Sequence, residues 1–85
     1  MKHFEDIWNE SESLVESNDA LGYINKAVEL LNEIATLKKN GTPEQVHEAY
    51  GLLLHTISGL TKLHNINIAA AMKYINDQVK IDRYC

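Results

Sequence analysis

The chain has 85 residues, a formal net charge of −4 and a hydrophobic content of 45%. A chain of this length buries only about 60–65% of the surface that it exposes when unfolded, so we expect one small domain, residues 1–85. No basic cluster exceeds the pair Lys38–Lys39, which argues against nucleic acid as a partner because phosphate binding requires a basic face. No apolar run approaches the roughly 20 residues of a membrane span, so membrane insertion is not expected.

The two ends of the chain indicate the cellular compartment. The N-terminal residues MKHFEDIWNE carry acids where a secretion signal needs an apolar core. The single cysteine, Cys85, cannot form an internal disulfide, which suits a reducing compartment. We therefore expect a cytoplasmic protein, and the excess of lysine over arginine favours a low-GC bacterium or a phage as its source. No role follows for His3, Tyr84 or Cys85.

Breaks at residues 17–19, 40–43 and 64–67 divide the chain into four helical segments. The first helix is expected over residues 4–16, within an N-terminal segment 1–17. Phe4 and Trp8 are expected in the core, and the alternative is that this helix docks onto a partner. The remaining helices form a core unit over residues 19–82. No segment alternates as a strand does, so the predicted fold is all-α, a small four-helix bundle.

The second and third helices have clear boundary signals. The second begins after Asn18 or Asp19, either of which is a good N-cap, and ends in cations followed by Gly41. Its apolar positions are Leu21, Ile24, Ala27, Val28, Leu31, Ile34 and Ala35. The third begins at Thr42-Pro43-Glu44-Gln45, where threonine and glutamine form a capping box around a proline at the first helical position. Its main apolar face contains Val46, Ala49, Tyr50, Leu53, Ile57 and Leu60.

The fourth helix is expected from about Asn67, with its apolar side facing inward: Ile68, Ala71, Met72, Ile75 and Val79. The third helix also carries Leu52 and Leu63 away from its main apolar face, and a helix that is apolar on two sides lies between other elements. In a chain this small, one of those elements is expected to be a second subunit. The sequence therefore predicts a homo-oligomer, at least a dimer.

Three segments carry a resemblance to a known family. VELLNEI (28–34), EAYGLLLHTISGL (48–60) and NINIAAAM (65–72) follow one another with the order and spacing of the MazG-type all-α nucleotide pyrophosphohydrolases, which include the phosphoribosyl-ATP pyrophosphatases. The likeness covers residues 25–84. Those enzymes carry ExxE on one helix and ExxD on the next, and the four carboxylates bind Mg²⁺ around the phosphates of a nucleotide.

Transferred position by position, the family's four ligands become Lys26, Glu29, Glu48 and Gly51. An ammonium in place of a carboxylate repels Mg²⁺, and a glycine supplies no ligand. The resemblance thus implies a metal site that has lost half of its acids, with no metal bound and no catalytic residue. Glu33 and His55 are the side chains that could assist such a site. Glu29 is expected to be a solvated helix position that pairs with Lys26 or with neighbours of Glu33, and the alternative is a role as a ligand. Glu48 is expected either to contact a ligand or to pair with Lys26 across the two helices.

The remaining notable residues have ordinary structural interpretations. His55 is expected at the edge of the core or in an interface, and His47 and His64 have no special role. Gly51 and Gly59 each cost about 1 kcal/mol against alanine inside a helix, so we expect a close approach of another helix at both positions.

These observations predict a catalytically degenerate MazG-like protein that acts as a regulatory or adaptor module through an unidentified protein partner. Two alternatives remain. One is a Mg²⁺-dependent nucleotide pyrophosphohydrolase that uses Glu29, Glu33, Glu48 and His55. The other is a sensor that binds a nucleotide without hydrolysing it, with Lys26 contacting a phosphate.

Overall fold

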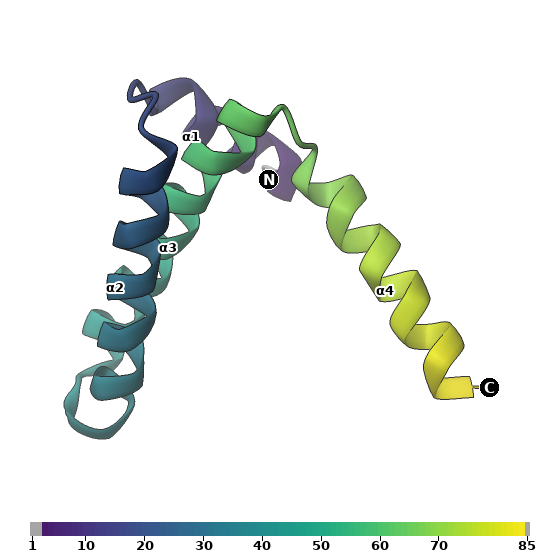
Figure 1. Cartoon of the computed structure of the whole chain (residues 1–85). Helices are drawn as coiled ribbons and strands as arrows, with labels where there is room; N and C mark the ends of the chain where they lie inside the picture. Colours follow the sequence, from purple (N-terminus) through teal and green to yellow (C-terminus); the bar gives the residue numbers. More distant parts are fainter. Residues whose placement is uncertain (1–2, 85) are drawn as a thin grey trace.

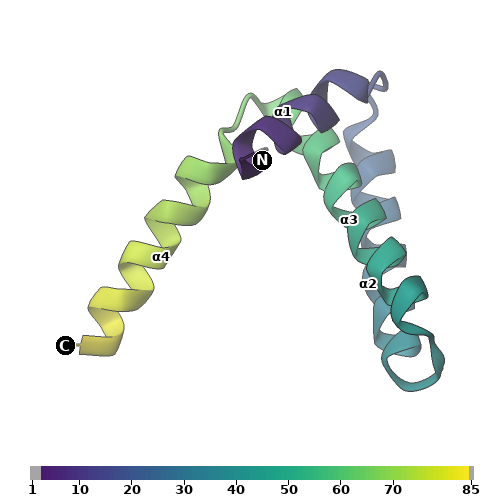
Figure 2. The same cartoon turned by 180° about the vertical axis from the view of Figure 1, so that it is seen from behind.

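The computed structural model describes residues 3–84, which form four α-helices and no strand. These helices are α1 (Phe4–Leu14), α2 (Ala20–Asn40), α3 (Pro43–His64) and α4 (Ile68–Tyr84). The predicted all-α fold of four helices is therefore confirmed. Helices α2 and α3 form an antiparallel hairpin, α1 crosses the second half of α3, and α4 runs away from the other three (Figure 1 and, from behind, Figure 2).

The two helix starts that the sequence predicted most firmly are confirmed. The carboxylate of Asp19 accepts a hydrogen bond from the backbone N–H of Gly22 over 3.0 Å and caps α2. At the start of α3, the hydroxyl of Thr42 accepts from the N–H of Gln45, and the side chain of Gln45 accepts from the N–H of Thr42. Both caps satisfy backbone donors that a helix leaves unpaired at its N-terminus.

The core of the hairpin lies between α2 and α3 and is small. Leu30 is only 1% exposed, and it is buried together with Ala49 and Leu53. Ala27 and Ile34, one turn on either side of Leu30, are half-buried. The predicted apolar side of α2 omitted Leu30, and most of the residues that it named lie on a different, exposed face.

Helix α1 ends two residues earlier than expected. Its last residue is Leu14, and Val15 adopts an extended backbone conformation with φ −86° and ψ 127°. Val15 is buried, and its carbonyl oxygen accepts a hydrogen bond of 2.6 Å from Nζ of Lys62. Because Val15 leaves the helix, its side chain is buried and its backbone carbonyl faces α3. Trp8 is also buried, as predicted, but Phe4 is 46% exposed, so its placement in the core was wrong.

The two glycines inside α3 have different surroundings. Gly59 is buried, and a Cβ atom added there would lie 2.7 Å from the ring of Tyr23 on α2. The ring is held in place because its hydroxyl donates a hydrogen bond of 2.9 Å to the carbonyl oxygen of Ser17. At Gly51 an added Cβ would meet nothing within 4 Å. The close helix approach predicted for both glycines is confirmed at Gly59 and wrong at Gly51.

Alanine substitutions at these two glycines should therefore change stability in opposite directions. Gly51→Ala should raise the free energy of unfolding by about 1 kcal/mol, because alanine is the better helix former and has free space. Gly59→Ala should lower it by about 1–2 kcal/mol, because displacing the Tyr23 ring outweighs that gain. Urea denaturation followed by circular dichroism measures both. Two changes of the same sign would contradict the packing of α2 against α3.

Helix α4 is separated from α3 by a short turn. Asn65, with φ 54° in the left-handed region that asparagine tolerates, ends α3. The side-chain oxygen of Asn67 then accepts a hydrogen bond of 3.0 Å from the N–H of Ala70 and caps α4. The expected inward face of α4 is not buried within the chain, because α4 projects away from the hairpin: Met72, Ile75 and Val79 are each about half exposed.

Candidate functional site

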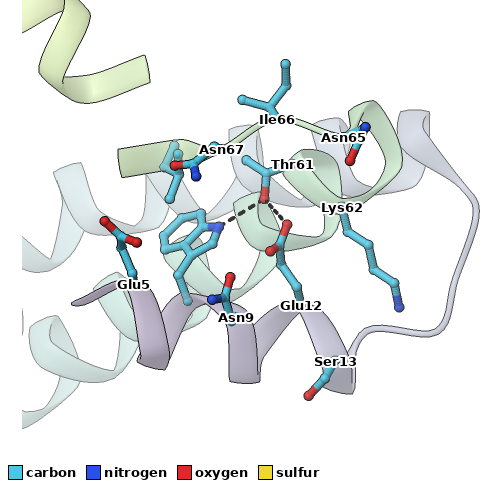
Figure 3. A pocket seen from close by; sticks show the side chains of 11 residues that line it. Glu5, Asn9, Glu12, Ser13, Thr61, Lys62, Asn65, Ile66 and Asn67 are labelled. Carbon is cyan, nitrogen blue, oxygen red and sulfur yellow. Dashed lines mark hydrogen bonds between the residues drawn. The ribbon is translucent and has the colours of Figure 1, made fainter. Parts of the chain in front are cut away.

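The contact between α1 and α3 is built on buried polar groups. Trp8 Nε1 donates a hydrogen bond of 2.9 Å to the hydroxyl of Thr61, which is itself buried. The proton of that hydroxyl lies within reach of two acceptors. They are Oε2 of Glu12 at 2.8 Å (Figure 3) and the carbonyl oxygen of Ser58 at 2.9 Å. Burying an indole requires such a partner for its N–H, so Thr61 determines where α1 sits on α3.

A polar pocket of about 420 Å³ opens beside this contact. Its walls come from α1, from the last turn of α3 and from the turn to α4: Glu5, Trp8, Asn9, Glu12, Ser13, Thr61, Lys62, Asn65, Ile66, Asn67 and Ile68 (Figure 3). Five of these eleven residues carry a carboxylate or an amide, so the pocket offers hydrogen-bonding groups to a polar ligand or a peptide. Its cation, Lys62, is already bonded to the Val15 carbonyl.

A chain of side chains links α1 to the middle of α3. Oγ of Ser11 lies 2.7 Å from Nδ1 of His55 and 2.8 Å from Oγ of the fully buried Ser58. Ser58 donates its hydroxyl proton to the backbone carbonyl oxygen of His55, because a carbonyl oxygen can only accept. Ser11 must then donate to Ser58, and the Nδ1–H of His55 must donate to Ser11.

This direction decides what the serine–histidine pair can do. A histidine that activates a serine accepts the hydroxyl proton, whereas here the imidazole donates to the hydroxyl. The hydrogen bonds among His55, Ser11 and Ser58 therefore form a structural link between α1 and α3. His55 lies at the edge of the α1–α3 contact, as the sequence predicted.

An apolar groove of about 400 Å³ lies on the other side of α1. Exposed apolar side chains of α1 form one wall, and α3 forms the floor, where Gly51 leaves space: Phe4, Ile7, Trp8, Glu10, Ser11, Leu14, Gly51, Leu54 and His55. At one end of the groove the rings of Phe4 and Trp8 contact each other, with their centroids 5.5 Å apart and their planes tilted by 39°. Contiguous exposed apolar surface is typical of sites where proteins bind other proteins or ligands, so the groove is a candidate binding surface.

The positions expected from the family's metal site lie in different surroundings. Nζ of Lys26 lies 3.8 Å from Oε1 of Glu29, one turn along the same helix, and both side chains are largely exposed, so the expected pairing of Glu29 is confirmed. Lys26 is thus paired within α2 and makes no ion pair with Glu48 among the interactions of residues 3–84. Gly51 opens into the groove against α1.

Glu33 and His55, the two side chains that could assist the metal site, also lie in different surroundings. Glu33 is exposed on α2, whereas His55 bonds to Ser11 on α1. Over residues 3–84, no group of three or more His, Cys, Asp or Glu side chains lies close enough to hold a metal ion. Within the same residues, no helix has both the length and the apolar character of a membrane span. Comparison of the chain with protein families, characterised proteins and solved structures found no match.

Sequence reasoning missed the polar groups that fix α1. Ser58 and Thr61 are three residues apart, so they lie on the same side of α3. Ser11 and Glu12 occupy the corresponding part of α1. A buried tryptophan on a short helix was a usable signal, because its N–H needs an acceptor on whichever helix it meets.

Proposed function

We propose that this chain is a self-associating regulatory or adaptor protein, a catalytically degenerate relative of the MazG-like enzymes, which acts through protein contacts. The observation that carries the proposal is the amount of apolar side chain left uncovered. Among the side chains whose burial the structure describes, residues 3–83, seventeen large hydrophobic side chains are exposed, against five buried hydrophobic residues. Single exposed apolar residues are ordinary, but contiguous apolar surface marks a site of association.

The chemistry of the candidate site supports the same proposal. The α1–α3 contact holds serine and histidine in a chain that joins two helices, and the polar pocket beside it is lined by amides and carboxylates. Lys26 and Glu29 neutralise one another on the outside of α2. Each of these groups serves a structural or surface role, which leaves recognition of a protein as the activity that the exposed groove and helix faces suit best.

Titration with Mg²⁺ and a panel of nucleoside triphosphates, coupled to an assay of pyrophosphate release, tests this proposal against its alternatives. We expect no heat of binding and no turnover above background, and Glu48→Gln should behave as the wild type does. Mg²⁺-dependent turnover that disappears in Glu48→Gln would establish the hydrolase instead. Nucleotide binding without turnover, weakened by Lys26→Gln, would establish the sensor.

A partner is sought by placing a photo-crosslinking amino acid at Leu54 in the apolar groove, with the same amino acid at the exposed Glu44 as the control. The proposal is supported by a protein that crosslinks from Leu54 and not from Glu44, and that binds again when both proteins are purified. Leu54→Asp should then weaken binding at least about 10-fold by placing an unpaired charge in the contact. Equal crosslinking from both positions, or no binding after purification, would contradict the proposal.

A further inference from the structure

The dimensions of the chain show how much surface its fold leaves uncovered. Its accessible surface is 6808 Å², whereas a compact monomer of 9.6 kDa exposes about 5,100 Å², so the excess is roughly 1,700 Å². Its radius of gyration is 14.9 Å, against about 12 Å for a compact chain of this length. A stable protein interface takes about 800 Å² from each partner, and obligate dimers take more. The excess is thus what one subunit of a tightly packed dimer would bury.

The uncovered surface includes two apolar stripes with the same spacing. We name Ile24, Val28, Leu31 and Ala35 the α2 stripe, and Ile68, Met72, Ile75 and Val79 the α4 stripe. Both follow steps of four, three and four residues, the spacing of a helix that packs lengthwise along another helix. Each stripe is about 17 Å long. All of these residues are exposed except Ile68, which is half-buried.

The residues that flank the two stripes are uncharged. They are Asn25, Ala27, Asn32 and Ile34 on α2, and Ala69, Ala71, Asn76 and Gln78 on α4. On α4, Lys73 and Asp77 lie off the stripe and pair with each other over 3.2 Å. Burying an unpaired charge costs free energy, and packing the two stripes together buries none. The next position of the same spacing is Lys38 on α2 and Asp82 on α4, so a parallel alignment of the stripes ends in an ion pair.

The geometry points to a second copy of this chain as the cover: we propose that α4 of each subunit packs in parallel along α2 of its partner, with the α4 stripe on the α2 stripe. Helices α2 and α4 both begin near α1 and diverge from it in the same general direction (Figures 1 and 2). A two-fold axis between these two arms brings each α4 beside the other subunit's α2, pointing the same way. In this register Ile68 meets Ile24, Met72 meets Val28, Ile75 meets Leu31 and Val79 meets Ala35.

The inference deepens the self-association in the proposed function and rests on it. Light scattering at tens of micromolar should give a wild-type dimer. Ile75→Asp should raise the dissociation constant at least about 100-fold, because the charge has no partner in the interface. Ile81→Asp is the matched control: it makes the same chemical change at a side chain of α4 that is equally exposed but lies off the stripe, and it should dimerise as the wild type does.

Mixing two disrupted variants tests the pairing itself. Leu31→Lys and Ile75→Asp should each be monomeric alone, because both contacts of a symmetric dimer are broken. A mixed dimer keeps one wild-type contact and places lysine against aspartate in the other, so mixing should restore dimers that contain one copy of each. Circular dichroism confirms that both variants retain their helices, and native mass spectrometry identifies the mixed species.

The possible outcomes separate the two proposals. A wild-type monomer would overturn self-association and the stripe pairing together. A dimer that Ile75→Asp leaves intact, or variants that do not restore one another when mixed, would overturn the pairing of α4 with α2 and leave a dimer built on another surface. If no partner binds at the groove, but mixing the two variants still restores dimers, only the adaptor function would be overturned.

Discussion

Replacing Trp8 with alanine should lower the free energy of unfolding by about 3–5 kcal/mol, the usual cost of deleting a buried aromatic side chain. Trp8 is 6% exposed and is the main apolar contact that α1 makes with the hairpin. The loss is large for a chain of this length, whose whole stability is expected to be about 4–13 kcal/mol. Because α1 packs on α3 and on no other helix to a comparable extent, its docking should be lost first. Denaturation followed by circular dichroism, with hydrogen exchange of the α1 amides, measures both effects.

Two further variants separate packing from hydrogen bonding at Trp8. Trp8→Phe keeps an aromatic ring but removes the N–H that donates to Thr61. It should lower the free energy of unfolding by about 1 kcal/mol beyond the loss that the smaller side chain causes. Phe4→Ala removes the neighbouring ring, which is 46% exposed, and should cost less than either change at Trp8. If Trp8→Ala left the stability within 1 kcal/mol of the wild type, the seating of α1 through Thr61 would be wrong.

Helix boundaries were predictable where the signal is local. The caps at Asp19 and Thr42 depend on residues within one turn, so the sequence contains all of the information. The end of α1 was not predictable from local signals, because the extended residue Val15 is buried and bonded to Lys62, 47 residues away. A helical pattern alone continues through Val15.

The face that a helix buries was harder to predict than the helix itself. Helix α2 is apolar on two sides: one contains Leu30 and packs on α3, and the other is the α2 stripe. Hydrophobic spacing identifies both sides but does not say which one meets a helix of the same chain. The same ambiguity accounts for the expected inward face of α4. Its spacing is correct for packing, although Met72, Ile75 and Val79 are left exposed by the helices of residues 3–84.

The candidate site was predictable only in its separate pieces. The Lys26–Glu29 pair follows from positions three residues apart on one helix. The surroundings of Gly51 depend on α1, which the family resemblance does not include. Ser58 and Thr61 were missed because a serine or threonine in an amphipathic helix is ordinarily read as solvent-exposed, and burial depends on the tryptophan that reaches it from the other end of the sequence.

Leu53→Ala should lower the free energy of unfolding by about 2–5 kcal/mol, because it removes three carbons from the centre of the α2–α3 contact and leaves a cavity. Leu53 is 6% exposed, and it packs in the same small core as Leu30. Its chain neighbour Leu52 provides the matched control: Leu52→Ala makes the same chemical change at a side chain that is 47% exposed, and it should cost less than about 1 kcal/mol. Urea denaturation of the two variants at the same protein concentration measures the difference.

The comparison also tests the orientation of α3. Successive residues of a helix differ by about 100° in direction, so Leu52 and Leu53 cannot share one contact. Equal losses at the two positions would mean that Leu52 is buried as deeply as Leu53, by a subunit packed on the far side of α3 instead of along the α2 stripe. A larger loss at Leu52 than at Leu53 would mean that α3 presents a different face to α2 from the one that buries Ala49 and Leu53.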